Sequence, residues 1–101
     1  MLFRSGVTLV LKGAGTVVTD PAGTLWINLT GNPGMAKGGM GDALTGIIGA
    51  FVAQGLSLLD AAKAGVYLHG TAGDLARQLH GEYSMQTTDL IAQLGPAFVG
   101  L

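Results

Sequence analysis

The sequence has no cysteine and few charged or aromatic residues. The lack of cysteine excludes a disulfide framework, a thiolate nucleophile and a zinc–thiolate site. Charged residues make up 11% of the 101 residues, against roughly 25% in an average soluble chain. Five basic and six acidic residues leave a formal charge of −1, so Lys and Arg are too few to displace counterions from nucleic-acid phosphates. With 6% aromatic residues there are also few platforms for base stacking, and we expect no nucleic-acid partner.

A long hydrophobic run suited to a membrane is also missing. The amino end has no charged segment followed by a long apolar stretch, so we expect no signal peptide. Residues 43–59 carry no charge, but about 17 residues is the lower limit of a spanning helix, and Gln54 and Ser57 interrupt the stretch. A buried helix is the favoured interpretation. We therefore expect no membrane partner. The lack of cysteine permits a reducing compartment without requiring one, and we expect a cytoplasmic location.

Glycine is abundant, with 18 residues in the chain, which is more than twice the usual frequency of roughly 7%. The glycines follow no three-residue period and lie among Val, Ile, Leu and Ala, so neither collagen nor a disordered linker is indicated. Hydrophobic residues make up 49% of a short chain, which leaves little polar surface to enclose a core. We expect the chain to be part of a larger fold or a homo-oligomer.

The order of the expected elements is that of an α/β chain. Residues 7–11 are β-branched and aliphatic with little alternation, which predicts a strand covered on both faces of the sheet. Strands at 17–19 and 24–28 flank the turn signature Asp20-Pro21-Ala22-Gly23 and predict a β-hairpin.

Three helices are expected after a glycine-rich loop. The first spans 41–54 and ends at Gly55, and the second spans 58–79 and ends at Gly81. Ser57 and Asp60 resemble a capping box at the start of the second helix. Thr87 or Thr88 is expected to cap a last helix over 89–94, which Gly95-Pro96 interrupts.

The loop from Asn32 to Asp42 is the part of the sequence that predicts chemistry. Glycines at 38, 39 and 41 allow successive backbone amides to converge on one point. The helix that follows adds its unpaired first amides and the positive end of its dipole, so the loop predicts a site for a phosphoryl group or a developing negative charge. The usual dinucleotide and P-loop fingerprints are both absent.

Asp42 stands at the mouth of this predicted anion hole, and two interpretations are open. It is a cap or first-turn residue, a common structural use of Asp. Alternatively it is a general base, because a carboxylate that accepts a hydroxyl proton beside amides that hold a phosphoryl group suits phosphoryl transfer.

Several stretches together resemble the ADP/ATP-dependent NAD(P)H-hydrate dehydratases, in the carboxyl-terminal part of their ribokinase-like catalytic domain. The stretches are Lys12-Gly13-Ala14-Gly15-Thr16, then 30–36 (TGNPGMA), 38–42 (GGMGD), 65–76 (GVYLHGTAGDLA) and 88–91 (TDLI). The resemblance implies a three-layer α/β/α fold, of which residues 1–101 form only the carboxyl-terminal portion: a strand, a β-hairpin, the glycine-rich anion-hole loop and three helices.

The resemblance also implies a reaction and a set of site residues. In that family a nucleotide, ADP or ATP with magnesium, phosphorylates the hydroxyl of hydrated NADH or NADPH, and loss of phosphate restores the double bond. By resemblance Asp42 binds the hydrate and acts as the base. The anion hole is formed by Gly39, Met40 and Gly41, and the nucleotide is bound by Gly41 and by Lys12, Gly13, Ala14, Gly15 and Thr16. No residue is assigned as a metal ligand.

Two departures from the family leave alternatives open. Lys37 stands where the family usually has a small or hydroxyl residue, and it either approaches phosphate or extends into solvent. The family's catalytic domain is much longer, and its amino-terminal elements supply most contacts to the hydrated nicotinamide. The alternatives are a small-molecule kinase of the same fold, or an inactive fragment that binds only nucleotide. The chain is expected to form a homo-oligomer or to associate with the missing amino-terminal part.

Three further polar residues lie on the second expected helix or directly after it. His69 and His80 match no metal-binding spacing, and we interpret His69 as a packed histidine. Asp74 is interpreted as a solvated or capping residue, with magnesium ligation as the alternative.

Overall fold

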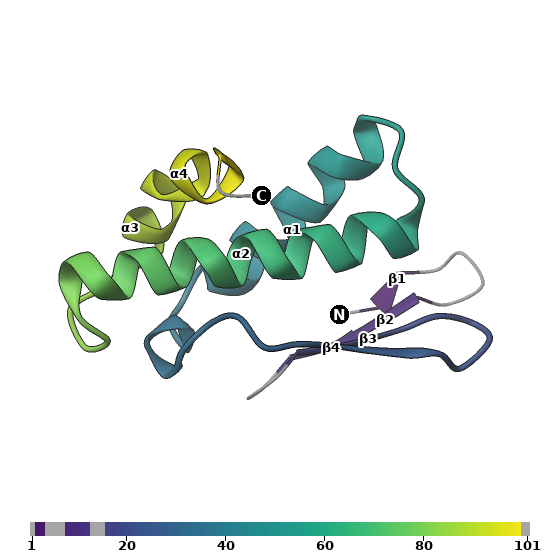
Figure 1. Ribbon diagram of the computed structural model, residues 1–101, viewed down its shortest axis with the longest axis horizontal. Helices are drawn as coiled ribbons and strands as arrows, with labels where there is room; N and C mark the ends of the chain where they lie inside the picture. The colour runs from purple at the N-terminus through teal and green to yellow at the C-terminus, as the bar shows by residue number, and fades with distance from the viewer. Residues whose placement is uncertain (1, 4–7, 13–15, 100–101) are drawn as a thin grey trace.

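A small antiparallel sheet carries the four described α-helices on one of its faces (Figure 1). The computed structural model describes residues 2–3, 8–12 and 16–99. The strands pair in chain order, each antiparallel to the next: β1 (Leu2–Phe3), β2 (Thr8–Leu11), β3 (Thr16–Thr19) and β4 (Leu25–Asn28). The sheet is therefore a meander, in which each described strand lies beside its neighbour in sequence.

The predicted β-hairpin is confirmed. Strands β3 and β4 pair with Val18 opposite Trp26. In the turn, Gly23 adopts a positive φ of 86° and its amide donates to the Asp20 carbonyl at 3.1 Å. The Asp20 carboxylate accepts a second bond from the Thr24 amide at 2.9 Å. The turn chemistry that the sequence indicated thus fixes the register of the two strands.

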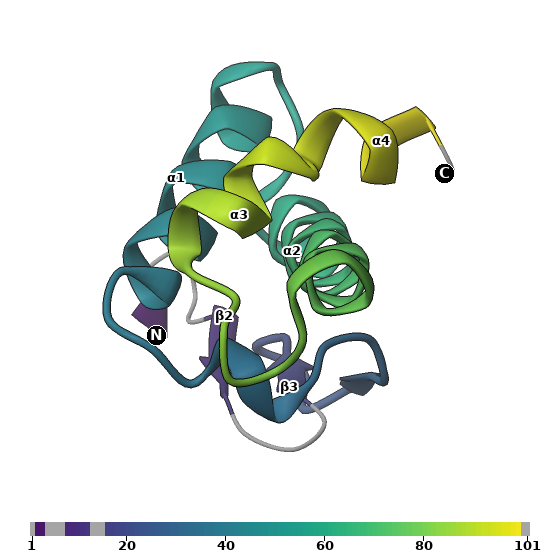
Figure 2. The same cartoon turned by 90° about the vertical axis from the view of Figure 1, so that its left-hand side faces the viewer.

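The helices follow the sheet in sequence and form two tiers above it. They are the short 3-10 helix η1 (Pro33–Met35) and the α-helices α1 (Met40–Ala53), α2 (Leu58–His80), α3 (Thr87–Ala92) and α4 (Leu94–Val99). Helix α2 lies between the sheet and the α3–α4 pair, with α1 alongside it (Figures 1 and 2). In the described part of the chain, no helix combines the length and apolarity needed to cross a bilayer.

The ends of α1 and α2 are those that the sequence predicts. Gly55 follows α1 with a φ of 101°, and Gly81 ends α2 with a φ of 79°. The Ser57 hydroxyl caps α2 by accepting from the Asp60 amide at 3.1 Å. Local glycine and hydroxyl signals are sufficient here because both loops are short and exposed.

The prediction for the last helix is wrong in two respects. The cap of α3 is Gln86 rather than a threonine, and its amide donates to the Asp89 carboxylate at 2.7 Å. The Gly95-Pro96 pair lies in the first turn of α4 instead of interrupting a helix, because proline is tolerated where its missing N–H has no partner to lose. The chain therefore has four described α-helices, not three.

Two groups of buried side chains form the core. The first lies between the sheet and the α1–α2 pair: Val10, Val18, Leu44, Ile48, Ala61, Ala62 and Val66. The second joins α1 and α2 to the α3–α4 segment: Met40, Leu68, Ala72, Ala76, Met85, Leu90 and Ala97. Small residues on α2 allow the close approach of its neighbours on both sides.

The expectation that the strand over residues 7–11 is covered on both faces is wrong for this chain. Val10 is fully buried beneath the helices, but on the opposite face Leu11 is 51% exposed, Leu25 61% and Ile27 64%. The four described α-helices follow the sheet in chain order and lie on the same side of it (Figure 1), so no α-helix of the described chain covers the other side. We call this surface, formed by Leu11, Leu25 and Ile27, the outer face.

Replacing Gly70 should destabilise the fold, because α2 approaches the backbone of residue 30 at this point. A Cβ added to Gly70 would lie 2.8 Å from the carbonyl carbon of Thr30. We expect Gly70→Ala to lower the free energy of unfolding by about 1–3 kcal/mol, measured by urea denaturation. Gly49→Ala is the matched control: its Cβ meets no atom within 4 Å, and it should stabilise by about 0.5–1 kcal/mol. Equal stability of Gly70→Ala and the wild type would contradict the close approach.

Candidate functional site

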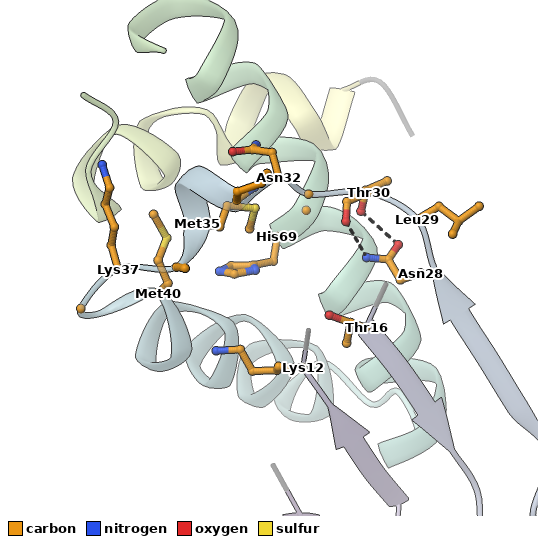
Figure 3. Close-up of a pocket in the computed structure, with 15 residues that line it drawn as sticks. Lys12, Thr16, Asn28, Leu29, Thr30, Asn32, Met35, Lys37, Met40 and His69 are labelled. Carbon is orange, nitrogen blue, oxygen red and sulfur yellow. Dashed lines mark hydrogen bonds between the residues drawn. The ribbon is translucent and has the colours of Figure 1, made fainter. Parts of the chain in front are cut away.

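A cleft of about 850 Å³ opens where the strands end and α1 begins (Figure 3). Its volume lies within the range of roughly 300–1,000 Å³ that is usual for small-molecule sites. Its walls come from the ends of β2, β3 and β4, the loop before α1, and the middle of α2. The lining residues are Lys12, Thr16, Asn28, Leu29, Thr30, Gly31, Asn32, Pro33, Met35, Ala36, Lys37, Gly38, Met40, His69 and Gly70.

A glycine turn at the edge of this cleft sets the start of α1. The Met40 amide donates to the Lys37 carbonyl at 3.3 Å, and Gly39 inside this turn adopts a φ of 87°, which glycine accepts without strain. The Thr87 hydroxyl at the start of α3 donates to the Gly38 carbonyl at 2.7 Å. Helix α3 therefore fastens the turn from outside, a role that the sequence did not reveal.

Some of the first backbone amides of α1 already donate hydrogen bonds within the chain, and others have no acceptor in the helix. The first helical bond runs from Ala43 to the Gly39 carbonyl at 3.0 Å, so the amides of Gly41 and Asp42 precede the ladder and have no acceptor within the helix. The Met40 amide, expected to belong to the anion hole, is already engaged with Lys37. An anion at this end of α1 therefore meets Gly41 and Asp42 first.

Lys12 brings a positive charge to the same place. It directly follows β2, and its ammonium nitrogen lies 3.1 Å from the position that a Cβ of Gly41 would occupy. The missing side chain at 41 is what allows the ammonium to come so close to the helix. Because both the ammonium and the helix start are positive, this corner of the cleft is suited to an anion.

The rest of the predicted nucleotide segment is described only at its ends. Thr16 is the first residue of β3 and lines the cleft together with Lys12. The intervening residues 13–15 (Gly13, Ala14 and Gly15) lie outside the described residues. The structure thus brings together the two described members of this segment.

Asp42 lies at the rim of the cleft and not in its wall. It is the third residue of α1, its side chain is exposed, and it is not among the described residues that line the cleft. The N-cap of α1 is Gly39, with no side-chain capping bond, so Asp42 is not the cap but the first-turn residue that the same structural interpretation allowed. A first-turn acid still favours the helix dipole, and the catalytic role of Asp42 stays a prediction.

His69 is buried in the wall of the cleft. Only 6% of the residue is exposed, and its ring projects from α2 towards the space beside Met40 and Lys12 (Figure 3). Among the described residues, no group binds its Nε2 atom. Burial lowers the pKa of His69 below its ordinary value of 6.5, a hydrogen bond with the Met40 backbone opposes this, and the charge of Lys12 lowers it further. The predicted packed histidine is indeed buried, but it also faces the cleft.

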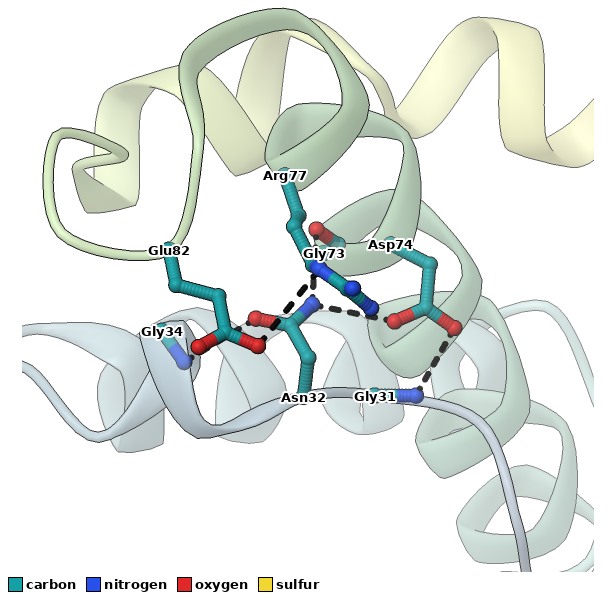
Figure 4. A network of polar contacts seen from close by, with 7 residues as sticks. All are labelled: Gly31, Asn32, Gly34, Gly73, Asp74, Arg77 and Glu82. Carbon is teal, nitrogen blue, oxygen red and sulfur yellow. Dashed lines mark hydrogen bonds and ion pairs between the residues drawn. The ribbon is translucent and has the colours of Figure 1, made fainter.

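A carboxylate on α2 holds the loop that forms one wall (Figure 4). Asp74 accepts from the Gly31 amide at 3.0 Å through Oδ2 and from the Asn32 side-chain amide at 2.9 Å through Oδ1. Asn32 also donates to the Gly73 carbonyl at 3.1 Å and accepts from the Gly34 amide at 3.0 Å. Both oxygens of Asp74 therefore fasten the loop, which supports its interpretation as a capping residue.

Lys37 has neither of the two roles expected for it. Its ammonium donates to the Tyr83 carbonyl at 2.8 Å and to the Met85 carbonyl, which ties the loop after α2 to the glycine turn.

Within residues 2–3, 8–12 and 16–99, no three His, Asp or Glu side chains form a group that could hold a metal ion.

Asn28 and Thr30 are site residues that the sequence analysis missed. The Asn28 side chain donates to the Val66 carbonyl at 3.1 Å, and the Thr30 hydroxyl donates to the Asn28 side-chain oxygen at 3.0 Å (Figure 3). These bonds fasten the end of β4 to α2. A polar residue at the end of an otherwise apolar strand was the available signal, but its partner lies 38 residues away.

Comparison with known proteins gives consistent matches. The family model described as NAD(P)H-hydrate dehydratase matches residues 3–95. The chain is 53% identical over 91 residues to the bifunctional NAD(P)H-hydrate repair enzyme Nnr of Vibrio cholerae. The aligned residues make up 90% of this chain and 18% of that protein. It is 46% identical over 76 residues to the ADP-dependent (S)-NAD(P)H-hydrate dehydratase of Neisseria meningitidis, covering 75% of this chain and 26% of that protein.

A solved structure shares the fold. The ADP/ATP-dependent NAD(P)H-hydrate dehydratase from Bacillus subtilis, co-crystallized with ATP/Mg²⁺, superimposes with a TM-score of 0.86 at 35% identity. The match covers 92% of this chain and 34% of that one. The chain thus spans about a third or less of the length of these relatives.

The buried imidazole should make stability depend on pH. Because burial lowers the pKa of His69 below 6.5, the unfolded chain binds a proton at a higher pH than the folded chain. The free energy of unfolding therefore falls as the pH drops through about 6.5, by at most about 1.4 kcal/mol per pH unit for one proton. Urea denaturation between about pH 5 and 8 should show a smaller slope for His69→Leu. Equal slopes for His69→Leu and the wild type would contradict the assignment.

Proposed function

Since the family model matches residues 3–95, the chain belongs to the NAD(P)H-hydrate dehydratase family, and we propose that it acts in the nucleotide-dependent repair of hydrated NADH and NADPH. Its fold is the ribokinase-like α/β fold of that family, in its carboxyl-terminal portion. The relatives named above supply the substrate class and the nucleotide. The chain's own geometry supports the transfer of a phosphoryl group.

One observation carries this proposal: the ammonium of Lys12 lies beside Gly41 at the start of α1. There the charge of the lysine and the amides of Gly41 and Asp42 approach the same volume at the edge of a cleft. Donors fixed in place before the reaction stabilise the charge that develops on a transferring phosphoryl group. Lys12 and Thr16, with Gly13, Ala14 and Gly15 between them, are proposed to bind ADP or ATP.

Asp42 is proposed to act as the base on the hydrate. Its carboxylate would accept the proton of the ring hydroxyl as the hydroxyl oxygen bonds to the terminal phosphorus of the nucleotide, which releases the shortened nucleotide. The C–O bond of the phosphorylated ring then breaks, phosphate departs with the bonding electrons, and loss of a neighbouring proton restores the double bond. The exposed rim position of Asp42 fits this role, since it leaves the carboxylate open to a substrate that enters from solvent.

The residues present fit a magnesium ion that arrives with the nucleotide. The described chain has no preformed group of three metal-binding side chains, and Mg²⁺ commonly binds through substrate phosphates, waters and one or two carboxylates. Phosphate oxygens and waters would supply the ligands of such an ion, which leaves the first-turn carboxylate of Asp42 free to act as the base. Bound in this way, magnesium would neutralise the phosphate charge during transfer.

The short length of the match favours a second candidate, nucleotide binding without turnover. The chain spans 18% of the Vibrio cholerae relative and 34% of the Bacillus subtilis chain. By the family resemblance, most contacts to the hydrated nicotinamide come from the amino-terminal part of the domain. A fragment with the anion site and without that part would bind nucleotide but hold the hydrate poorly.

The test is the return of reduced-nicotinamide absorbance when the 101-residue chain is incubated with hydrated NADH, magnesium and ADP or ATP. We expect Asp42→Asn to lower this rate by about 10²–10⁴-fold, the usual contribution of a general base. Because Asp42 is exposed and is not the cap of α1, the variant should unfold at nearly the same denaturant concentration as the wild type.

Asp60→Asn is the matched control for this experiment. Asp60 is the third residue of α2, is exposed as Asp42 is, and has the same relation to its helix dipole. It should leave the rate unchanged. An unchanged rate in Asp42→Asn would show that Asp42 is not the base and acts only as an acidic residue in the first turn of α1. Release of a stable phosphorylated product would indicate a kinase, and nucleotide binding without any product would favour the second candidate.

We also propose that the outer face is covered in the working protein, by a second copy of this chain or by the further part of the domain that the longer relatives possess. Leu11, Leu25 and Ile27 are each more than half exposed there, and adjoining apolar side chains on a sheet favour association. Sedimentation of the isolated chain should therefore show dimers or larger species. Ile27→Lys should shift the distribution towards monomer, whereas a monodisperse wild-type monomer would contradict the proposal.

A further inference from the structure

We propose that His69 binds the nucleoside part of the nucleotide, with its Nε2 atom accepting a hydrogen bond from a hydroxyl or amino group. This inference rests on the proposed nucleotide site and adds a residue to it. His69 is 94% removed from solvent and lines the cleft, and its Nε2 atom has no partner in the described chain. Buried polar atoms almost always have a partner. Nε2 is itself covered from solvent, so a ligand in the cleft reaches it when the neighbouring side chains shift, and the flexible side chains of Met35 and Met40 line the same cleft.

The chemistry of the ring decides what kind of group this partner is. The Met40 backbone hydrogen-bonds the imidazole, and because Nε2 has no partner, this bond belongs to Nδ1. A ring whose Nδ1–H donates to a carbonyl presents an unprotonated Nε2 when neutral, and that atom is an acceptor. Burial and the nearby Lys12 charge both lower the pKa of His69 and so favour the neutral ring. The ligand must therefore offer a donor.

This requirement excludes the phosphates of the nucleotide as the partner. Phosphate oxygens at neutral pH are acceptors with negative charge, and an unprotonated nitrogen repels them. The anion end of the cleft is the corner where Lys12 meets Gly41. The donors that remain on an adenine nucleotide are the ribose hydroxyls and the exocyclic amine. Met35 and Met40 line the cleft as well as His69, and polarisable thioethers suit the faces of a base or sugar.

Other charged groups around the cleft do not change this assignment. Lys37, from the loop before α1, is bound to the Tyr83 and Met85 carbonyls. Asp74, on the same helix as His69, binds Gly31 and Asn32. Asp42 is exposed on the first turn of α1. Lys12 is therefore the charged group that acts on His69 from across the cleft.

The experiment compares two probes by calorimetry on the full chain at about pH 8, where an unperturbed His is neutral. The probes are ADP, which contains the nucleoside, and inorganic pyrophosphate, which contains only the anion. His69→Leu keeps similar bulk without an acceptor and should weaken ADP binding by about tenfold, one neutral hydrogen bond, with pyrophosphate binding unchanged. His69→Gln, which restores an acceptor, should recover most of the ADP affinity. His80→Gln, an exposed histidine change on the same helix, should alter neither.

Each other outcome overturns the inference in a distinct way. Unchanged ADP affinity in His69→Leu would show that the ring only packs. Equal losses for ADP and pyrophosphate would show that the variant affects the anion corner or the shape of the cleft. If the wild-type chain binds neither probe, the proposed nucleotide site itself is wrong and this inference fails with it, whereas normal wild-type binding with an unaffected variant refutes the role of His69 alone.

The pH dependence of ADP binding provides a second test, because a histidine that only packs would not change it. Protonation turns Nε2 into a donor with a positive charge, so ADP should lose its nucleoside contact while pyrophosphate gains attraction. Between about pH 8 and 5.5, the ratio of ADP affinity to pyrophosphate affinity should fall in the wild type. In His69→Leu the ratio should change less, since the titrating ring is gone, and identical pH profiles for the two proteins would overturn the inference.

Discussion

A carboxylate on the longest helix holds a segment of backbone that precedes it by 43 residues, and the cleft takes its shape from that contact. Asp74 binds the Gly31 amide and the Asn32 side chain, and Asn32 then binds the Gly34 amide. Bonds between an ionised carboxylate and amide donors are among the stronger hydrogen bonds in proteins. Because α2 also packs against the sheet, α1, α3 and α4, the loop is fixed to the element that contacts most of the molecule.

The cleft that results has two chemically different parts. In one corner the ammonium of Lys12 lies beside the bare backbone of Gly41, where charge is exposed to a ligand. Facing Lys12, Met35 and the ring of His69 line the wall (Figure 3), and burial lowers the pKa of that ring. A nucleotide is likewise divided into a charged phosphate chain and an uncharged nucleoside. This shared division links the proposed reaction to the role assigned to His69.

Much of the fold could be predicted from local signals, and the failures have a common cause. Gly55 and Gly81 end α1 and α2 as predicted, because a positive φ after a helix is a local requirement. Thr87 has a hydroxyl that suits a helix cap, but this hydroxyl donates to the Gly38 carbonyl in a distant loop. The cap of α3 is therefore the preceding residue, Gln86. His69 was predicted to be buried, whereas its orientation towards the cleft depends on how α2 packs against the start of α1. Sequence patterns identify local geometry, and contacts between distant segments decide the remainder.

The bare backbone at position 41 has a consequence for how the protein can change. Glycine is a poorer helix former than alanine, so a larger residue at this position, the second of α1, would favour α1 considered alone. The same residue would push the Lys12 ammonium, 3.1 Å from the first added carbon, away from the helix start. A side chain at position 41 would therefore raise the stability of α1 and weaken anion binding beside Lys12, which is a trade-off between stability and function.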